Sequence, residues 1–252
     1  MKVSLSLEKT CSDDVSIVVD SLRASTTITV AFDNFKKVIP CFSPEQAFEL
    51  KEKYGGILAG ERTGSTIEGF DIGNSPTAIQ SYETDEDILI LTTSNGTRII
   101  EPMTSTVLIG TFTNCKAVAK AAVELAEDHI DLVMAGFNGK FGIDDFLGAG
   151  SILYWIEKEL ENSDNNKVYE GTLAKDEGKY YWKDIDGLSE YAKSAIIAYS
   201  NEELSKEAIR NCRSGKRLTY LGYRDDVEFC MKQNISENVP IYKNGILELY
   251  NK

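Results

Sequence analysis

Residues 20–27, with the sequence Asp-Ser-Leu-Arg-Ala-Ser-Thr-Thr, bring a carboxylate, a guanidinium and several hydroxyl groups close together. They follow the apolar run at residues 15–19, which predicts a short buried strand, and they lead into a segment with helical character. In open α/β sheets ligands bind at this kind of turn, and the start of a helix offers free N–H groups to an anion. Asp20 could hold a metal ion, Arg23 could bind phosphate oxygens, and the hydroxyls could add donors. A Ser/Thr-rich helix start with a surface ion pair is the alternative.

The same arrangement recurs after further apolar runs, each of which predicts a strand. The polar segments are residues 60–62 (Gly-Glu-Arg), 94–98 (Ser-Asn-Gly-Thr-Arg), 110–114 (Gly-Thr-Phe-Thr-Asn) and 136–139 (Gly-Phe-Asn-Gly), with Asp144 and Asp145 a few residues further on. One polar turn after a strand is ordinary. A series of turns rich in Gly, Asn, Thr, Arg and carboxylates instead indicates loops that converge on one rim of a sheet. We therefore expect a site at that rim.

The elements that must position these loops alternate between strand and helix over residues 15–160. Such alternation predicts an α/β fold, layered α/β/α, with a largely parallel or mixed sheet. A polar stretch at residues 161–166 suggests a division into a main α/β domain, 1–162, which carries the site, and a smaller C-terminal α/β part, 163–252, as a subdomain or cap. The aromatic and charged stretch at 169–182 predicts a surface hairpin or, alternatively, an interface of a homo-oligomer.

The charge balance excludes several classes of partner. The chain has 40 acidic and 27 basic residues, which give a net charge of −13. This field repels nucleic acid and anionic membranes, so we expect neither as a partner. No apolar run approaches the roughly 20 residues that span a bilayer, and the first residues lack the apolar core of a signal peptide. A cytoplasmic protein is expected.

The cysteines and the histidine narrow the chemistry further. The five cysteines are scattered, and no Cys-x-x-Cys pair occurs, so free thiols are expected rather than a zinc site or a redox couple. His129, the single histidine, follows a helical pattern at residues 117–128 and is typical of a surface position at a helix end. One histidine argues against a two-histidine metal site and against Ser–His–Asp hydrolysis. Carboxylates, arginines and hydroxyls remain, which favours oxygen-ligated Mg²⁺.

Several motifs of the chain are shared with a known family. They are residues 20–27, 58–62 (Leu-Ala-Gly-Glu-Arg), 69–76 (Gly-Phe-Asp-Ile-Gly-Asn-Ser-Pro), 91–98 (Leu-Thr-Thr-Ser-Asn-Gly-Thr-Arg), 108–114, 144–150 and 218–230. In order and spacing they resemble the 2-phosphosulfolactate phosphatase family from about residue 15 to 240. The motifs at 69–76 and 91–98 are long enough to be specific, whereas Gly-Glu-Arg alone is weak.

This resemblance implies an Mg²⁺-dependent hydrolase, a phosphatase that converts 2-phospho-3-sulfolactate to 3-sulfolactate and phosphate. In methanogens the step belongs to coenzyme M biosynthesis. The chain departs from the family at three places: Ser21 stands where Val is more frequent, Asp144–Asp145 where a Glu–Asp pair is more frequent, and Gly148 where Cys is more frequent. Because aspartate reaches less far than glutamate, the role of residue 144 stays open.

With the resemblance, site roles follow. The metal ligands are expected to be Asp20, Glu61, Asp71 and Asp145, some of them through water, because Mg²⁺ takes only one or two direct carboxylates. The catalytic residues are expected to be Asp20, Arg23, Arg62 and Asp145. Substrate binding is expected from Ser25, Thr26, Asn74, Ser75, Asn95, Gly96, Thr97 and Arg98. The guanidinium groups pair with phosphate and sulfonate alike, while a turn or cap role is the alternative for each other polar residue.

Two chemical routes stay open for hydrolysis of this small anionic phosphorylated substrate. A water activated at the metal could attack phosphorus with a carboxylate as base, or Asp20 could attack and form an aspartyl-phosphate. We favour the water slightly, because no Asp-x-Asp nucleophile motif follows a buried strand. The alternative functions are a phosphatase of the same family acting on another small phosphomonoester, and a non-catalytic anion-binding protein.

Overall fold

The fold was taken from a computed structural model of the chain. It describes residues 1–62, 65–93, 99–100, 102–137, 139–162, 173–176, 179–182 and 187–251. Within this part, no helix is both long and apolar enough to cross a membrane.

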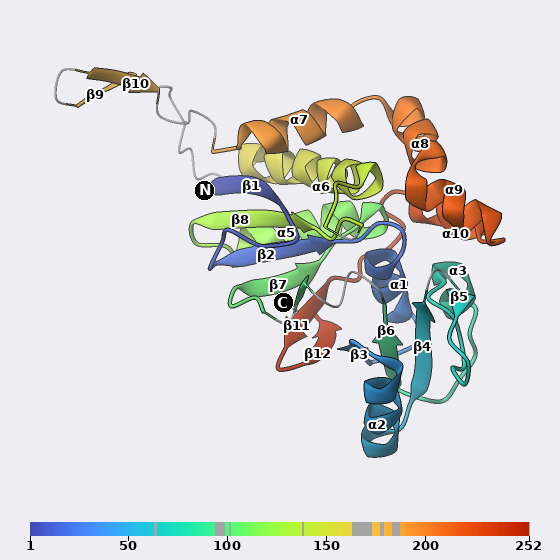
Figure 1. The fold of residues 1–252 in the computed structure, drawn as a ribbon. Coiled ribbons are helices and arrows are strands. Elements are labelled where there is room, and N and C mark those ends of the chain that lie inside the picture. Colours follow the sequence, from blue (N-terminus) through green and yellow to red (C-terminus); the bar gives the residue numbers. More distant parts are fainter. Residues whose placement is uncertain are drawn as a thin grey trace.

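A single large sheet forms the centre of the molecule (Figure 1). Its strands, in spatial order, are β1 (Lys2–Leu7), β8 (His129–Met134), β2 (Val15–Val19), β7 (Thr106–Ile109), β11 (Pro240–Lys243), β12 (Ile246–Leu249), β3 (Lys37–Cys41), β6 (Ile88–Thr92), β4 (Ile57–Arg62) and β5 (Ser65–Thr66). A separate antiparallel pair consists of β9 (Leu173–Asp176) and β10 (Lys179–Trp182). The mixed sheet confirms the predicted fold class.

The sheet consists of two parallel halves joined by an antiparallel hairpin. Strands β1, β8, β2 and β7 run parallel to one another, and so do β3, β6 and β4. The hairpin β11–β12, which comes from the C-terminal segment, pairs antiparallel with β7 on one side and with β3 on the other. The last strands of the chain therefore complete the sheet begun by the first 162 residues.

Helices cover both faces of the sheet. They are α1 (Ala24–Ala31), α2 (Pro44–Tyr54), α3 (Pro76–Gln80), the 3₁₀ turn η1 (Phe112–Asn114), α5 (Cys115–Leu125), α6 (Ile143–Asn162), α7 (Glu190–Tyr199), α8 (Glu202–Asn211), α9 (Arg213–Tyr220) and α10 (Arg224–Cys230). Helices α5, α6 and α7 pack on one face of the β1–β7 half, and α1 packs on the opposite face. The layered α/β/α arrangement is thus confirmed.

Helix α1 explains how the two halves meet. All eight of its residues are buried, as expected of a helix that is enclosed on every side. Ile28 shares a core with Val18 and Ile109 of one half and also with Leu89 and Leu91 of the other. The sheet therefore wraps around α1, and in Figure 1 the carboxyl ends of β2, β4 and β6 all reach this helix.

Candidate active site

Four carboxylates gather where the two halves of the sheet meet. Asp20 follows β2 directly, Glu61 is near the end of β4, and Asp144 and Asp145 lie in the first turn of α6. Their exposed fractions are 7%, 9%, 5% and 4% respectively. The electrostatic influence of Asp144 and Glu61 reaches Asp20, and that of Asp20 reaches Asp145, so the four form one cluster. We call it the acid cluster.

Burial and mutual repulsion make ionisation of the acid cluster costly. Burial, followed by the charges of Asp144 and Glu61, raises the pKa of Asp20 to about 7. Burial, together with Asp144 and Asp20, raises the pKa of Asp145 well above its ordinary value, and burial also raises that of Asp144. Buried charges are ordinarily paired or bound to a metal. An all-oxygen set of this kind fits a hard divalent cation.

Two backbone N–H groups fix the orientation of Asp145. Its Oδ1 accepts a hydrogen bond from Ser21 N at 2.8 Å, and its Oδ2 accepts one from Gly136 N at 2.9 Å. Gly136 has a φ of +64°, and a Cβ there would stand 2.6 Å from the carbonyl oxygen of Lys140, so only glycine fits. Each carboxylate oxygen keeps a further lone pair, so Asp145 remains able to bind a cation.

Asp71 lies apart from the acid cluster, which corrects the expectation that the four acids predicted from sequence lie together. Its Oδ2 accepts hydrogen bonds from Lys51 Nζ at 2.7 Å and from Leu58 N at 2.8 Å. Leu58 is near the amino end of β4, whereas Glu61 is near its carboxyl end. Asp71 therefore ties α2 to the edge of the sheet, and Asp144, whose role the sequence left open, completes the cluster.

Arg23 is held by an acid that the sequence had not singled out. Its Nη1 lies 2.8 Å from Oδ2 of Asp226, and the two side chains are 3% and 1% exposed. The guanidinium also stacks on Tyr223, 4.4 Å from the ring centre. Oδ1 of Asp226 accepts hydrogen bonds from the hydroxyls of Ser75 at 2.8 Å and Thr77 at 2.6 Å. Asp226 thus joins α10 to the turn before α1 and to the start of α3.

Arg62 directly follows Glu61 of the acid cluster at the end of β4. It donates from Nη1 to the carbonyl oxygen of Glu61 at 2.8 Å. From Nη2 it donates to the carbonyl oxygen of Phe42 at 2.7 Å and to the hydroxyl of Thr92 at 3.0 Å. These bonds fix the position of the guanidinium at the carboxyl end of the strand.

The predicted substrate-binding hydroxyls are engaged within the fold. The Ser25 hydroxyl accepts from Asp20 N at 2.9 Å and donates to the carbonyl oxygen of Val18, so it shapes the turn that presents Asp20. Thr26 is fully buried and donates to the carbonyl oxygen of Ser21. All residues of α1 are buried, so its hydroxyl groups lie inside the protein and not at its surface.

The remaining predicted binding residues divide between caps and the loop at 94–98. Ser75 caps α3 and donates to Asp226. The buried Asn74 Oδ1 has no hydrogen-bond partner among the described residues, as is typical of a group awaiting a ligand or water. Asn95, Gly96, Thr97 and Arg98 lie outside the described residues.

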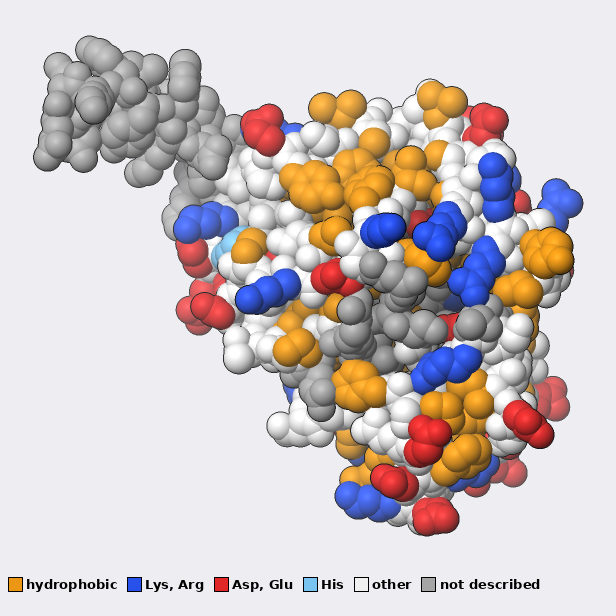
Figure 2. Space-filling model, in the orientation of Figure 1, with side chains coloured by type: hydrophobic (Ala, Val, Ile, Leu, Met, Phe, Trp, Pro, Cys, Tyr) orange, Lys and Arg blue, Asp and Glu red, His pale blue; other side chains and the backbone are white. Residues whose placement is uncertain are grey.

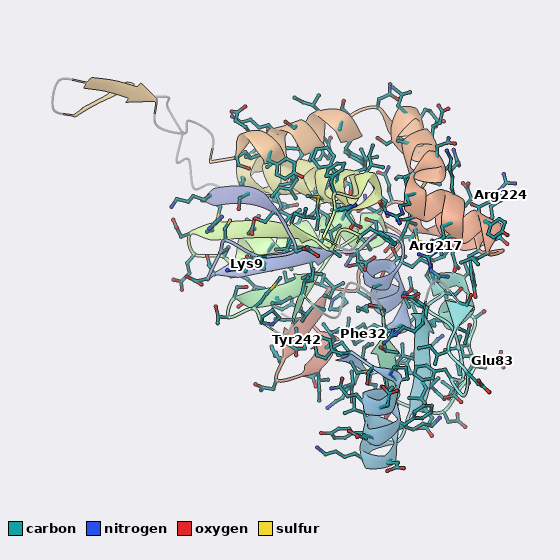
Figure 3. The ribbon with its side chains drawn as sticks, in the orientation of Figure 1. Lys9, Phe32, Glu83, Arg217, Arg224 and Tyr242 are labelled. Carbon is teal, nitrogen blue, oxygen red and sulfur yellow. The ribbon has the colours of Figure 1, made fainter. Side chains whose placement is uncertain are left out.

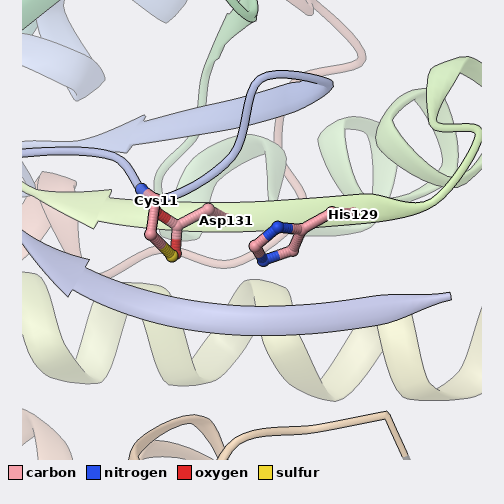
Figure 4. A group of neighbouring side chains, drawn as sticks. All are labelled: Cys11, His129 and Asp131. Carbon is pink, nitrogen blue, oxygen red and sulfur yellow. Dashed lines mark hydrogen bonds between the residues drawn. The ribbon is translucent and has the colours of Figure 1, made fainter.

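A second group of potential ligands lies near the amino end of β8 (Figure 4). The ligand atoms of Cys11, His129 and Asp131 lie within 4.8 Å of one another. The Ser4 hydroxyl stands among them, 2.7 Å from Nε2 of His129, 2.6 Å from Oδ1 of Asp131 and 3.3 Å from Sγ of Cys11. Oδ2 of Asp131 accepts from Thr10 Oγ1 and Cys11 N. These hydrogen bonds hold the loop after β1 against the sheet.

The position of His129 differs from the sequence expectation. It is the first residue of β8, and α5 ends earlier, at Leu125. The reason is Asp14, whose Oδ2 accepts hydrogen bonds from the backbone N–H groups of residues 127, 128 and 129. In a continuing helix these three N–H groups would bond to carbonyl oxygens four residues earlier, so their bonds to Asp14 require that the helix has already ended.

Comparison with known proteins finds relatives that match nearly the whole chain. A model of the family described as 2-phosphosulpholactate phosphatase matches residues 2–245. The 2-phosphosulfolactate phosphatase of Methanothermobacter thermautotrophicus is 43% identical over 249 residues, which cover 99% of this chain and 96% of the relative. A probable 2-phosphosulfolactate phosphatase of Clostridium acetobutylicum is 36% identical, covering 94% and 93% of the two chains. One of Thermotoga maritima is 33% identical, covering 93% and 91%. The chain belongs to the 2-phosphosulfolactate phosphatase family.

Proposed function

We propose that this protein is an Mg²⁺-dependent phosphatase that hydrolyses 2-phospho-3-sulfolactate to 3-sulfolactate and phosphate. The observation that carries the proposal is the acid cluster at the meeting point of both halves of the sheet, in a chain that is similar along its whole length to proteins of that name. An anion-binding protein would have no use for four buried carboxylates beside its ligand, because they would repel it.

The acid cluster would hold Mg²⁺ through Asp20 and Asp145, with Asp144 and Glu61 as further direct or water-mediated ligands. The fit rests on the donor set, which is all oxygen, and on the raised pKa values, because a bound cation would relieve the repulsion that causes them. When bound, Mg²⁺ would supply charge neutralisation to the phosphoryl oxygens.

The protein's own groups would do the rest of the chemistry. A carboxylate of the acid cluster, with Asp20 as our choice, would take the proton of the attacking water, because Asp20 directly follows β2 and lies within electrostatic reach of the other acids of the cluster. Arg62 would stabilise the charge on the phosphoryl oxygens. The other route, attack by Asp20 itself, would leave a phosphoryl group on that residue; mass spectrometry of acid-quenched turnover mixtures distinguishes the two.

The function is tested by phosphate release from 2-phosphosulfolactate, with Mg²⁺ or with EDTA, beside a panel of plain phosphomonoesters. We expect release that depends on Mg²⁺ and is fastest on the sulfonated ester. Faster phosphate release from a panel compound would support phosphatase activity but would reject 2-phosphosulfolactate as the substrate. No release from any compound would favour the anion-binding protein.

The acid cluster also predicts how stability responds to pH and metal. Because folding raises the pKa of Asp20 from 3.8 to about 7, the fold favours its protonated form. Its contribution to stability is therefore present below about pH 4 and is lost as pH rises to about 7, a loss of about 4 kcal/mol at most. We expect metal-free protein to lose stability over this range, and Mg²⁺ to stabilise it more at pH 7.5 than at pH 5.

Urea unfolding with EDTA or with Mg²⁺ at the two pH values measures the effect. The informative comparison is with Asp20→Asn. This variant should lose the part of the pH dependence of stability that comes from Asp20, whereas every other titratable residue is still present. Identical pH slopes for the two proteins in EDTA would contradict the prediction.

A further inference from the structure

Two arginines on α9, Arg213 and Arg217, lie beside the acid cluster. Helix α9 begins next to this cluster, because the Ser214 side chain forms a hydrogen bond with Asp144. The arginines are four residues apart and therefore lie on the same side of the helix. Both guanidinium groups lie over the ring of Phe137, at 4.1 Å for Arg213 and 5.9 Å for Arg217.

Phe137 places these arginines at the edge of the candidate site. It directly follows Gly136, whose N–H holds Asp145, so it belongs to the loop that leaves β8 for the acid cluster. Figure 3 labels Arg217 on α9, and its guanidinium lies near the ring of Phe137 in this loop. Stacking uses the face of a guanidinium and leaves its N–H edges available for an oxyanion.

The charges of the two arginines are not neutralised within the described part of the chain. Neither forms an ion pair there, although acids outnumber bases by 40 to 27. By contrast, Arg23 is paired with Asp226 and Arg210 with Glu228. Figure 2 shows several Lys and Arg side chains gathered on the face that carries α9. In a chain of net charge −13, this group of basic side chains forms a local positive region that attracts anions.

We propose that Arg213 and Arg217 bind the anionic group of the substrate that is not hydrolysed, the sulfonate, while the acid cluster and Arg62 act on the phosphoryl group. The inference rests on the proposed function and adds the residues that select a phosphoester with a second strong anion. The charge of Arg23, by contrast, is already opposed by Asp226 in a buried ion pair. A sulfonate presents three oxygens, which suits two guanidinium forks.

The test compares Arg213→Ala, Arg217→Ala and the double variant on two substrates, 2-phosphosulfolactate and p-nitrophenyl phosphate, which has no second anionic group. On the sulfonated ester we expect kcat/KM to fall about 10-fold for each single variant and about 100-fold for the double variant, mainly through KM. On p-nitrophenyl phosphate we expect changes smaller than about 2-fold, because the lost contacts are to a group that this ester lacks.

Lys216→Ala provides the matched control. Lys216 is an exposed cation on the same helix, so its removal changes the net charge equally without changing the proposed contacts. The inference is overturned if the double variant loses activity equally on both esters, or if it loses none on the sulfonated ester. Equal losses would indicate a structural role of α9.

A binding measurement separates failure of this inference from failure of the proposed function. If the wild-type protein releases phosphate from neither ester, calorimetry with 3-sulfolactate and with lactate still tests the arginines. We expect the wild-type protein to bind 3-sulfolactate at least about 10-fold more tightly than lactate, and the double variant to lose this preference. No preference in the wild-type protein would reject the sulfonate site.

Discussion

Replacing Asp20 with asparagine is expected to lower kcat/KM for the phosphoester at least about 1,000-fold, because the residue combines cation binding with proton transfer. Asparagine keeps the shape of the side chain and the hydrogen bond from Ala24 N, so the fold should be kept. It also removes one of the mutually repelling buried carboxylates, so the metal-free protein should be as stable as the wild type or more so. Steady-state kinetics with saturating Mg²⁺, together with urea unfolding, measure both effects.

Asp71→Asn is the matched control for this substitution. Both aspartates belong to motifs shared with the family, but Asp71 binds Lys51 and Leu58 N away from the acid cluster. We expect Asp71→Asn to keep kcat/KM within about 3-fold and to lose only the modest stability of a half-exposed ion pair. An Asp71 variant as inactive as the Asp20 variant would show that the four acids of the sequence prediction do act together.

The acids at strand ends could be predicted from the sequence because the rule behind them is local. A buried apolar run followed by a polar turn identifies a carboxyl end of a strand, and such ends meet at one edge of a parallel sheet. Asp20 and Glu61 satisfy this rule although they belong to opposite halves of the sheet. The same rule placed Asp71, in the loop that follows β4, at this rim as well, but its carboxylate lies on Leu58 N near the amino end of that strand.

The contacts of the C-terminal segment could not be predicted in the same way. Asp226 meets Arg23 across 203 residues of sequence, and nothing in the local pattern of either indicates the other. Insertion of β11–β12 between β7 and β3 also depends on pairing between distant strands. Such contacts follow from the whole fold, whereas hydrophobic periodicity reports only the neighbours along the chain.

Two of the departures from the family pattern prove to be neighbours in space. A Cβ added at Gly148 would overlap the Ser21 hydroxyl. Ser21 also supplies the backbone N–H that holds Asp145, so the glycine on α6 permits the close approach of the turn before α1 to the acid cluster. In the sequence, Ser21 and Gly148 are two separate departures from the family pattern. Their connection becomes visible only from the packing of α6 against that turn.

The buried pair of Arg23 and Asp226 predicts a large loss of stability when one partner is removed. Asp226→Ala would remove the acid that pairs with the buried guanidinium of Arg23 and would deprive Ser75 and Thr77 of an acceptor. We expect a loss of about 3–5 kcal/mol in the free energy of unfolding, because an uncompensated buried charge is strongly unfavourable. Urea unfolding with Mg²⁺ present measures it.

Two further variants test whether the loss of stability comes from the ion pair itself: Asp225→Ala, and a double variant that removes both partners. Asp225 is exposed at the start of the same helix, so Asp225→Ala should change stability by less than about 1 kcal/mol. Combining Asp226→Ala with Arg23→Met should cost less than the sum of the two single substitutions, because the second change removes the charge that the first left unpaired. Additive costs would mean that the two side chains do not stabilise each other. The contribution of Asp226 to stability would then come from its hydrogen bonds with the hydroxyls of Ser75 and Thr77 instead.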